Sequence, residues 1–100
     1  MESAPIGTIL KYKLQITASG FDMSTDRFDI VVSCSGKELV LTQADVLADL
    51  ENNYYIVIDT SVFRSGVLRA KTVAYINDPD CPGGTRTEVD VQELKRLIHA

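Results

Sequence analysis

The chain has 100 residues, of which 45 % are hydrophobic and 24 % are charged, and its formal net charge is −4. These values predict one globular domain over residues 1–100 and exclude a disordered chain, which would be less hydrophobic and more highly charged. The ten Lys and Arg residues are spread along the chain, so we expect no nucleic-acid partner, and a core of this size needs no metal or cofactor.

The first residues lack the basic start and the apolar run of a secretion signal. No stretch approaches the roughly 20 apolar residues that span a bilayer. We therefore expect no signal peptide and no membrane contact. Cys34 and Cys81 permit one disulfide at most, and without an export signal we expect both to be buried free thiols.

The first half of the chain predicts three strands. Between residues 9 and 18 apolar and polar residues alternate, which is the two-residue period of a half-buried strand. Residues 19–26 are rich in turn formers and predict a loop, after which the alternation resumes over 28–34. A tight connection at 35–37 leads into a strand at 38–41, so these two strands should form an antiparallel hairpin.

Residues 42–50 interrupt the strand pattern. Thr42 is followed three positions later by Asp45, which is a helix-capping signature. The apolar residues that follow would share one side of a turn or two. We predict one short helical insert here.

The second half predicts three more strands. The aromatic and β-branched residues 54–59 predict a central strand with both faces covered. A turn leads to a long alternating strand at 67–76. Two prolines and two glycines at 77–84 exclude regular structure and predict an exposed loop. Residues 85–91 predict a last strand that pairs with the one before it.

The residues beyond this last strand carry a different pattern. Leu94, Leu97 and Ile98 are spaced to share one face of a helix. We therefore predict that residues 92–100 form a tail with a C-terminal helical turn, outside a core of about residues 7–91. Five or more short strands joined by turns predict an all-β fold, either a sandwich or a barrel.

The segment around Asp59 is the strongest enzymatic signal. Residues 56–61 resemble the strand-to-turn segment of retroviral-type aspartic proteases, in which two close carboxylates share a proton. Those enzymes carry Gly where Ser61 stands here, and a Gly-rich flap that this sequence lacks. The single histidine, His99, has no nucleophile or carboxylate predicted beside it. We therefore predict no enzymatic activity and no catalytic residue, and we interpret Asp59 as the end of a strand.

Two loops carry oxygen ligands suited to calcium. Asp78 and Asp80 lie in the 77–84 loop, and Asp22 or Asp26 from another loop could join them. The further acidic positions and closing glutamate of an EF-hand are missing, and aspartates also cap turns. Asp78 and Asp80 are therefore calcium candidates, with turn capping as the favoured interpretation.

Three tyrosines, Tyr54, Tyr55 and Tyr75, could form a platform on which a sugar stacks. Each lies in a predicted strand, and the chain has no Trp. This pattern favours packing in the core or at an interface. Sugar binding is the alternative interpretation.

Several segments between residues 7 and 88 together resemble one known family. They are Gly7-Thr8 at the entry to the Lys- and Leu-alternating strand, Phe28-Asp29-Ile30, and residues 55–60, 64–70 and 78–88. With these segments the chain resembles the immunoglobulin-like modules of phage tail and baseplate proteins. The likeness is to the baseplate upper protein N-terminal type, which includes small prophage versions.

The resemblance implies an immunoglobulin-like antiparallel β-sandwich that is a structural and assembly module of a phage or prophage tail-baseplate complex. Its partners would be other tail or baseplate proteins or further copies of itself, and it would be a virion component or lie in the host cytoplasm. The insert at 42–50 and the absence of Trp depart from antibody-type domains. The alternative function is a glycan- or calcium-binding adhesion-type module that uses the loops at 22–26 and 78–84.

Overall fold

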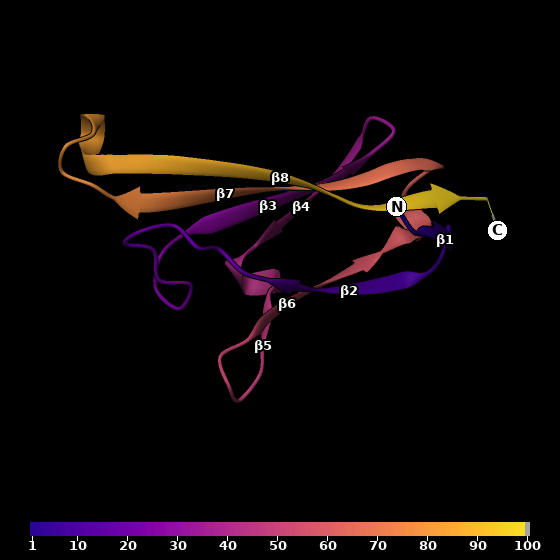
Figure 1. The fold of residues 1–100 in the computed structure, drawn as a ribbon, viewed down its shortest axis with the longest axis horizontal. Helices are drawn as coiled ribbons and strands as arrows, with labels where there is room; N and C mark the ends of the chain where they lie inside the picture. Colours follow the sequence, from indigo (N-terminus) through magenta and orange to yellow (C-terminus); the bar gives the residue numbers. More distant parts are fainter. Residues whose placement is uncertain (100) are drawn as a thin grey trace.

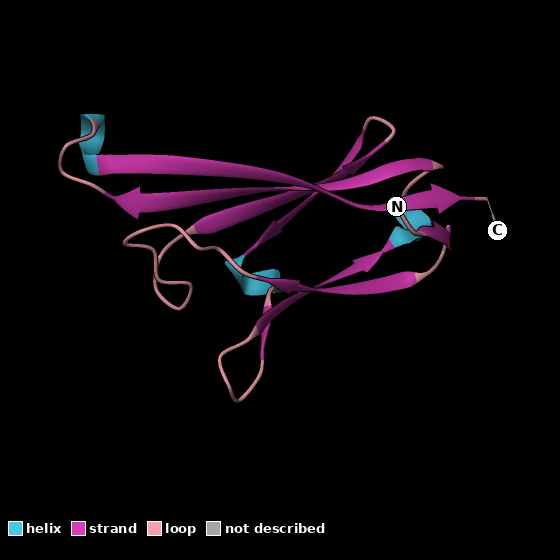
Figure 2. Ribbon diagram, in the orientation of Figure 1, coloured by secondary structure: helices cyan, strands magenta, loops and turns pink. Residues whose placement is uncertain are grey.

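The computed structural model describes residues 1–99, which form two β-sheets with almost no helix (Figure 2). One sheet has five strands in the order β1-β8-β7-β3-β4, and the other has three in the order β2-β6-β5 (Figure 1). The all-β prediction is therefore confirmed. The strands are β1 (Ser3–Pro5), β2 (Ile9–Leu14), β3 (Phe28–Cys34), β4 (Lys37–Thr42), β5 (Leu47–Ala48), β6 (Tyr54–Asp59), β7 (Gly66–Asn77) and β8 (Thr85–Ile98).

The five-stranded sheet contains both hairpins that the sequence predicts. β3 pairs antiparallel with β4, and β7 pairs antiparallel with β8. The β3–β4 turn consists of Ser35 and Gly36, whose φ angles of 50° and 81° are both left-handed, as a tight two-residue hairpin requires. β3 and β7 are also antiparallel neighbours.

The prediction of a purely antiparallel fold is wrong at one edge, since β1 runs parallel to β8. Ser3 lies opposite Arg96 there, and the Arg96 N–H donates to the Glu2 carbonyl at 3.0 Å. Ala4 is buried in the core. This burial and the backbone hydrogen bonds hold β1 against the last residues of β8.

The three-stranded sheet has β6 at its centre, with β2 and β5 antiparallel on either side. The predicted central position of this strand is confirmed. Only one of its faces is covered, however, because Ile56 and Ile58 are buried whereas Val57 is 42 % exposed. The sheet packs through its inner face against the five-stranded sheet, so the outer face remains open to solvent.

The core lies between the inner faces of the two sheets. It extends beyond the predicted bounds of 7–91, because Ala4 and Leu97 are both buried. Burying a large apolar side chain contributes roughly 1.5–3 kcal/mol, so these inner residues dominate the stability. The least exposed large apolar residues are Phe28, Ile30, Val32, Ile58, Leu68, Ile76 and Leu97.

A β-bulge divides β8 into two parts. Leu68 pairs with Lys95, whereas Arg69 pairs with Glu93, so Leu94 is an extra residue in β8. Side chains alternate between the two faces of a strand. The extra residue therefore reverses which residues of β8 face the core on its two sides, before and after Leu94.

The exchange brings polar residues to the inner face of β8. In the part of β8 that precedes the bulge, Glu88 lies opposite the buried Ala74 and therefore shares its inward face. Val89 and Val91 point outward and are 55 % and 57 % exposed. These two valines of β8 therefore do not contribute to the core, although they lie within its predicted bounds of 7–91.

Residues 92–98 belong to the sheet, so the predicted C-terminal tail with its helical turn is wrong. β8 continues to Ile98, and Leu97 is only 1 % exposed. The prediction failed because the bulge at Leu94 breaks the two-residue alternation and leaves apolar residues at helix-like spacing.

The prediction of a helical insert at 42–50 is right for one turn and wrong for the residues that follow it. Gln43–Asp45 form a single 3₁₀ turn, with a hydrogen bond from the Thr42 N–H to Asp45 Oδ2 at 2.9 Å. The chain then enters β5, and Leu50 is fully exposed instead of packing as a helix face would. None of the helical turns within residues 1–99 is long and apolar enough to cross a membrane.

Cys34 and Cys81 are both free, as predicted. Cys34 is buried, and its thiol lies 3.3 Å from the Arg64 carbonyl oxygen. Cys81 is only half-buried, in the loop between β7 and β8. The prediction of burial is therefore confirmed for Cys34 alone.

Candidate functional site

The outer face of the five-stranded sheet carries valines on four neighbouring strands, of which Val40, Val89 and Val91 are exposed and Val31 and Val73 are half-buried. Val89 lies opposite Val73, and Val40 lies opposite Val31. Val91 follows Val89 on the same face of β8. We call these five residues the valine face.

Charged residues interrupt the valine face. Lys71 lies in register between Val31 and Val91. Beside it, Arg69 Nη2 and Glu93 Oε2 form an ion pair across β7 and β8 at 2.9 Å. Exposed pairs of this kind contribute at most about 1 kcal/mol to stability, so their main effect is to restrict which partners fit.

Tyr75 borders the valine face near the end of β7. Its hydroxyl donates to Asp29 Oδ2 at 3.1 Å, and the Arg27 guanidinium carbon lies 4.6 Å from the centre of its ring. Arg27 also contacts Asp29 at 3.4 Å. These contacts hold a tyrosine and an arginine in place, and both residue types are enriched in protein interfaces.

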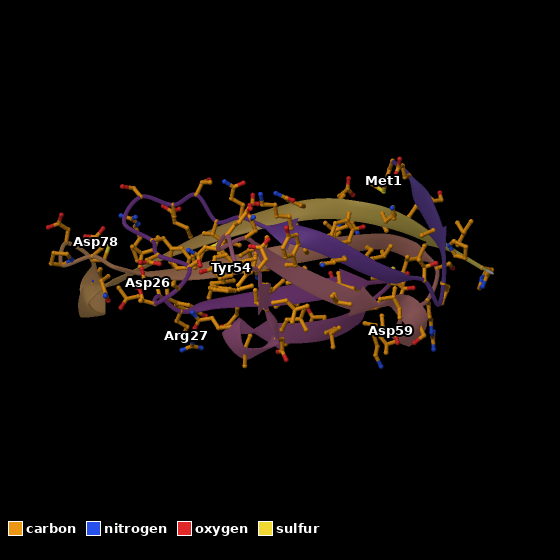
Figure 3. The ribbon with its side chains drawn as sticks, turned by 90° about the horizontal axis from the view of Figure 1, so that it is seen from below. Met1, Asp26, Arg27, Tyr54, Asp59 and Asp78 are labelled. Atoms are coloured by element: carbon orange, nitrogen blue, oxygen red, sulfur yellow. The ribbon has the colours of Figure 1, made fainter. Side chains whose placement is uncertain are left out.

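The two predicted ligand loops lie at the same end of the molecule. The loop before β3 and the β7–β8 loop both project at the left of Figure 1, and Asp26 and Asp78 lie at one end in Figure 3. Arg86 links them, because it donates to the Ser19 carbonyl at 3.0 Å and pairs with Asp78 Oδ2 at 2.8 Å. No sequence pattern singles out Arg86, since only the folded chain shows that it bridges two loops.

The acidic residues of these loops cap turns. Asp78 Oδ1 accepts a hydrogen bond from the Asp80 N–H at 3.0 Å, and Asp26 Oδ2 accepts from the Asp22 N–H at 2.8 Å. Hydrogen bonds from the Ser24 hydroxyl and N–H hold the pKa of the Asp22 carboxyl below its ordinary value. Within residues 1–99 no group of three or more His, Cys, Asp or Glu side chains is arranged to hold a metal ion.

A hollow of about 620 Å³ lies beside these loops, between the loop before β3 and the start of β6. Aromatic side chains, Phe21 and Tyr54, share it with the polar side chains of Asp22, Ser24 and Asn52. Tyr54 is one of the three tyrosines that the sequence singles out, whereas Asn52 was not predicted. The available signal was the tolerance of Asn for a left-handed backbone, which Asn52 adopts with a φ of 60°.

The three tyrosines do not form one platform. Tyr54 and Tyr55 are consecutive in β6 and therefore point to opposite faces of the three-stranded sheet. Lys11 Nζ lies 4.6 Å from the centre of the Tyr55 ring. Tyr75 belongs to the other sheet.

Asp59 and His99 lie apart from these loops. Asp59 ends β6 and caps the following 3₁₀ turn, Thr60–Val62, by accepting a hydrogen bond from the Ser61 N–H at 3.0 Å. This backbone hydrogen bond holds the pKa of the Asp59 carboxyl below its ordinary value. Figure 3 shows Asp59 at the opposite end from Asp78. His99 is exposed after the end of β8.

No family model matches this chain, and no curated protein and no solved structure matches it.

Proposed function

We propose that the chain is an immunoglobulin-like structural module that assembles into a phage or prophage tail-baseplate complex through protein–protein contacts, without enzymatic activity. The segments that resemble phage baseplate modules support this assignment. A chain that assembles in this way is expected to present a rigid, partly apolar surface to its neighbours.

The order of the strands supports the immunoglobulin-like part of the proposal. In such sandwiches strands C, F and G form one sheet with an added C′ strand, and strands B, E and D form the other. Here β3, β7, β8 and β4 occupy the C, F, G and C′ places, and β2, β6 and β5 occupy the B, E and D places.

The observation that carries the functional proposal is the valine face. Its residues stand on hydrogen-bonded neighbouring strands, so they are held in place before any partner binds. A preorganised surface loses little conformational entropy on association. Covering the exposed Val40, Val89 and Val91 would remove apolar area from water, which favours binding.

Light scattering and cross-linking test the proposal, first on the chain alone and then with the products of neighbouring genes. We expect association with one of these products, or self-association, that buries the valine face. A strict monomer that associates with none of them would contradict the proposal.

A second candidate is a ligand-binding module that uses the hollow beside Phe21 and Tyr54. The combination of two aromatic rings with Asp22, Ser24 and Asn52 favours a glycan, which offers flat apolar faces and hydroxyl groups. Thermal melting with oligosaccharides and with calcium tests it, because a ligand at 100 times its dissociation constant adds roughly 2.7 kcal/mol. An unchanged melting temperature with both probes would remove this candidate.

A further inference from the structure

A groove of about 660 Å³ opens along one side of the molecule, between β2 with its continuation at 15–18 and the inner faces of β7 and β8. Ala70, Thr72 and Ala74 of β7 line one wall. Glu88 and Asp90 of β8 also line it, and they face inward because of the bulge at Leu94.

The groove exists because the two sheets differ in width. β2 is the edge strand of the three-stranded sheet and pairs only with β6. The continuation at 15–17 keeps the alternating burial of β2, yet within residues 1–99 no backbone hydrogen bond joins it to another strand. Backbone donors and acceptors along this side of β2 are therefore available to a further strand.

The side chains around the groove define what could fill it. Small residues, Ala70 and Ala74, form part of the wall, and Ile30 and Ile56 of the core also contribute to the lining. Large apolar side chains would fit against this surface and lose contact with water. Asp90 has no cationic partner among the described residues, so a Lys or Arg of an occupant would gain an ion pair there.

We propose that this groove binds an extended segment of a partner protein, which adds a fourth strand beside β2. The segment would alternate apolar residues, facing the core, with residues that include Lys or Arg near Glu88 and Asp90. Main-chain hydrogen bonds to β2 supply affinity in this mode of binding, and the side-chain positions supply specificity.

Two observations favour a single foreign segment over the edge of a second folded copy. The first is that β2 is an edge strand with an unpaired side that a single further strand can occupy. The second is charge. The chain is acidic, with a net charge of −4, and Asp90, which has no cationic partner among the described residues, would repel a similarly acidic copy.

The groove lies on the inner side of the five-stranded sheet and the valine face lies on its outer side, and of the residues named for the two sites only Val89 borders both. Peptide binding in the groove and association through the valine face can therefore be tested separately. The proposal for the groove does not depend on the phage assignment.

Peptide binding to the purified chain tests the proposal. The probe is a short fluorescent peptide that alternates Val and Lys, with a Val/Glu peptide of equal length as its counterpart. We expect the Val/Lys peptide to bind better and to protect the amides of 15–17 from hydrogen exchange. In a chain with Glu88→Lys and Asp90→Lys, at two exposed positions, we expect its affinity to fall about tenfold and the preference to reverse.

A pair of variants separates the groove from the rest of the surface. Thr72→Phe should fill the groove and abolish peptide binding, whereas Val57→Phe, at an exposed position on the outer face of the three-stranded sheet, should leave it unchanged. Urea unfolding of each variant checks that it folds.

Three results would overturn the proposal. The first is no binding at about 1 mM peptide. The second is a preference that the charge reversal leaves unchanged, or protection confined to the free edges of β4 and β5. The third is protection of 15–17 that rises with protein concentration in the absence of peptide, which would assign the groove to a second copy.

Discussion

Val73 and Val89 lie directly opposite each other on the outer face of the five-stranded sheet. Their pairing is a consequence of the bulge at Leu94, which turns the valines of β8 outward. The valines of β8 therefore lie on the outer face, where they belong to the proposed contact surface.

We expect Val89→Glu to weaken association of the chain at least about tenfold, because it places an unpaired charge in the valine face. Stability should change by less than about 1 kcal/mol, since Val89 is exposed. Light scattering over a concentration series, with partner present, measures the association. The control is Val57→Glu, on the outer face of the other sheet, which should leave association unchanged. Equal effects of the two substitutions would contradict this prediction.

Thr60 is the one buried polar side chain in the core of residues 1–99. Its hydroxyl donates to the Thr8 carbonyl at 2.6 Å and accepts from the Gly7 N–H at 2.9 Å. Thr60→Val should lower the free energy of unfolding by about 1–3 kcal/mol, because the Gly7 N–H loses its partner. Thr60→Ser keeps the hydroxyl and should lose less in a urea titration. A larger loss for Ser than for Val would show that the methyl group matters more than the hydrogen bonds.

Gly66 begins β7 with a φ of 143°, and a β-carbon at this position would collide with Ser35 Oγ. Gly66→Ala should therefore destabilise the fold by about 1–3 kcal/mol through backbone strain and the clash. Gly36→Ala is the matched comparison, because Gly36 also has a positive φ but open space around its α-carbon. Urea unfolding should show the greater loss for Gly66→Ala, and an equal loss would mean that the Ser35 contact costs nothing.

Asp49 organises the turn between β5 and β6. The backbone N–H of Asn53 donates to it at 2.9 Å and holds the pKa of its carboxyl below the ordinary value. A folded-state pKa that is lowered means that the carboxylate stabilises the fold above its ordinary pKa of about 3.9, and that this contribution is lost as the pH falls through the folded-state pKa. Asp49→Asn should therefore lose less stability than the parent chain between neutral pH and pH 3. Thermal melting at both pH values measures the difference, and identical losses would refute it.

The alternation of side chains was enough to predict β2, β3 and β7, because one face of each strand packs on the core. The aromatic and β-branched composition of residues 54–59 was enough to predict β6, but it did not predict that the outer face of this strand is open to solvent. The turn formed by Ser35 and Gly36 was equally local, since a short loop between two strands permits only antiparallel pairing. For the candidate site, the sequence identified the end loops and their aspartates but could not place them at one end of the molecule.

By itself the sequence determined an all-β fold, the hairpins and the irregular loop before β8, since these follow from local periodicity and turn chemistry. Only the tertiary structure decided that β1 pairs parallel to β8, that β8 runs to Ile98, and which of its residues face inward. The physical reason is that these choices depend on contacts between distant parts of the chain. Burying Leu97 and Ala4 together requires one extra residue at Leu94, and that residue turns Val89 outward and leaves the groove beside β2 open.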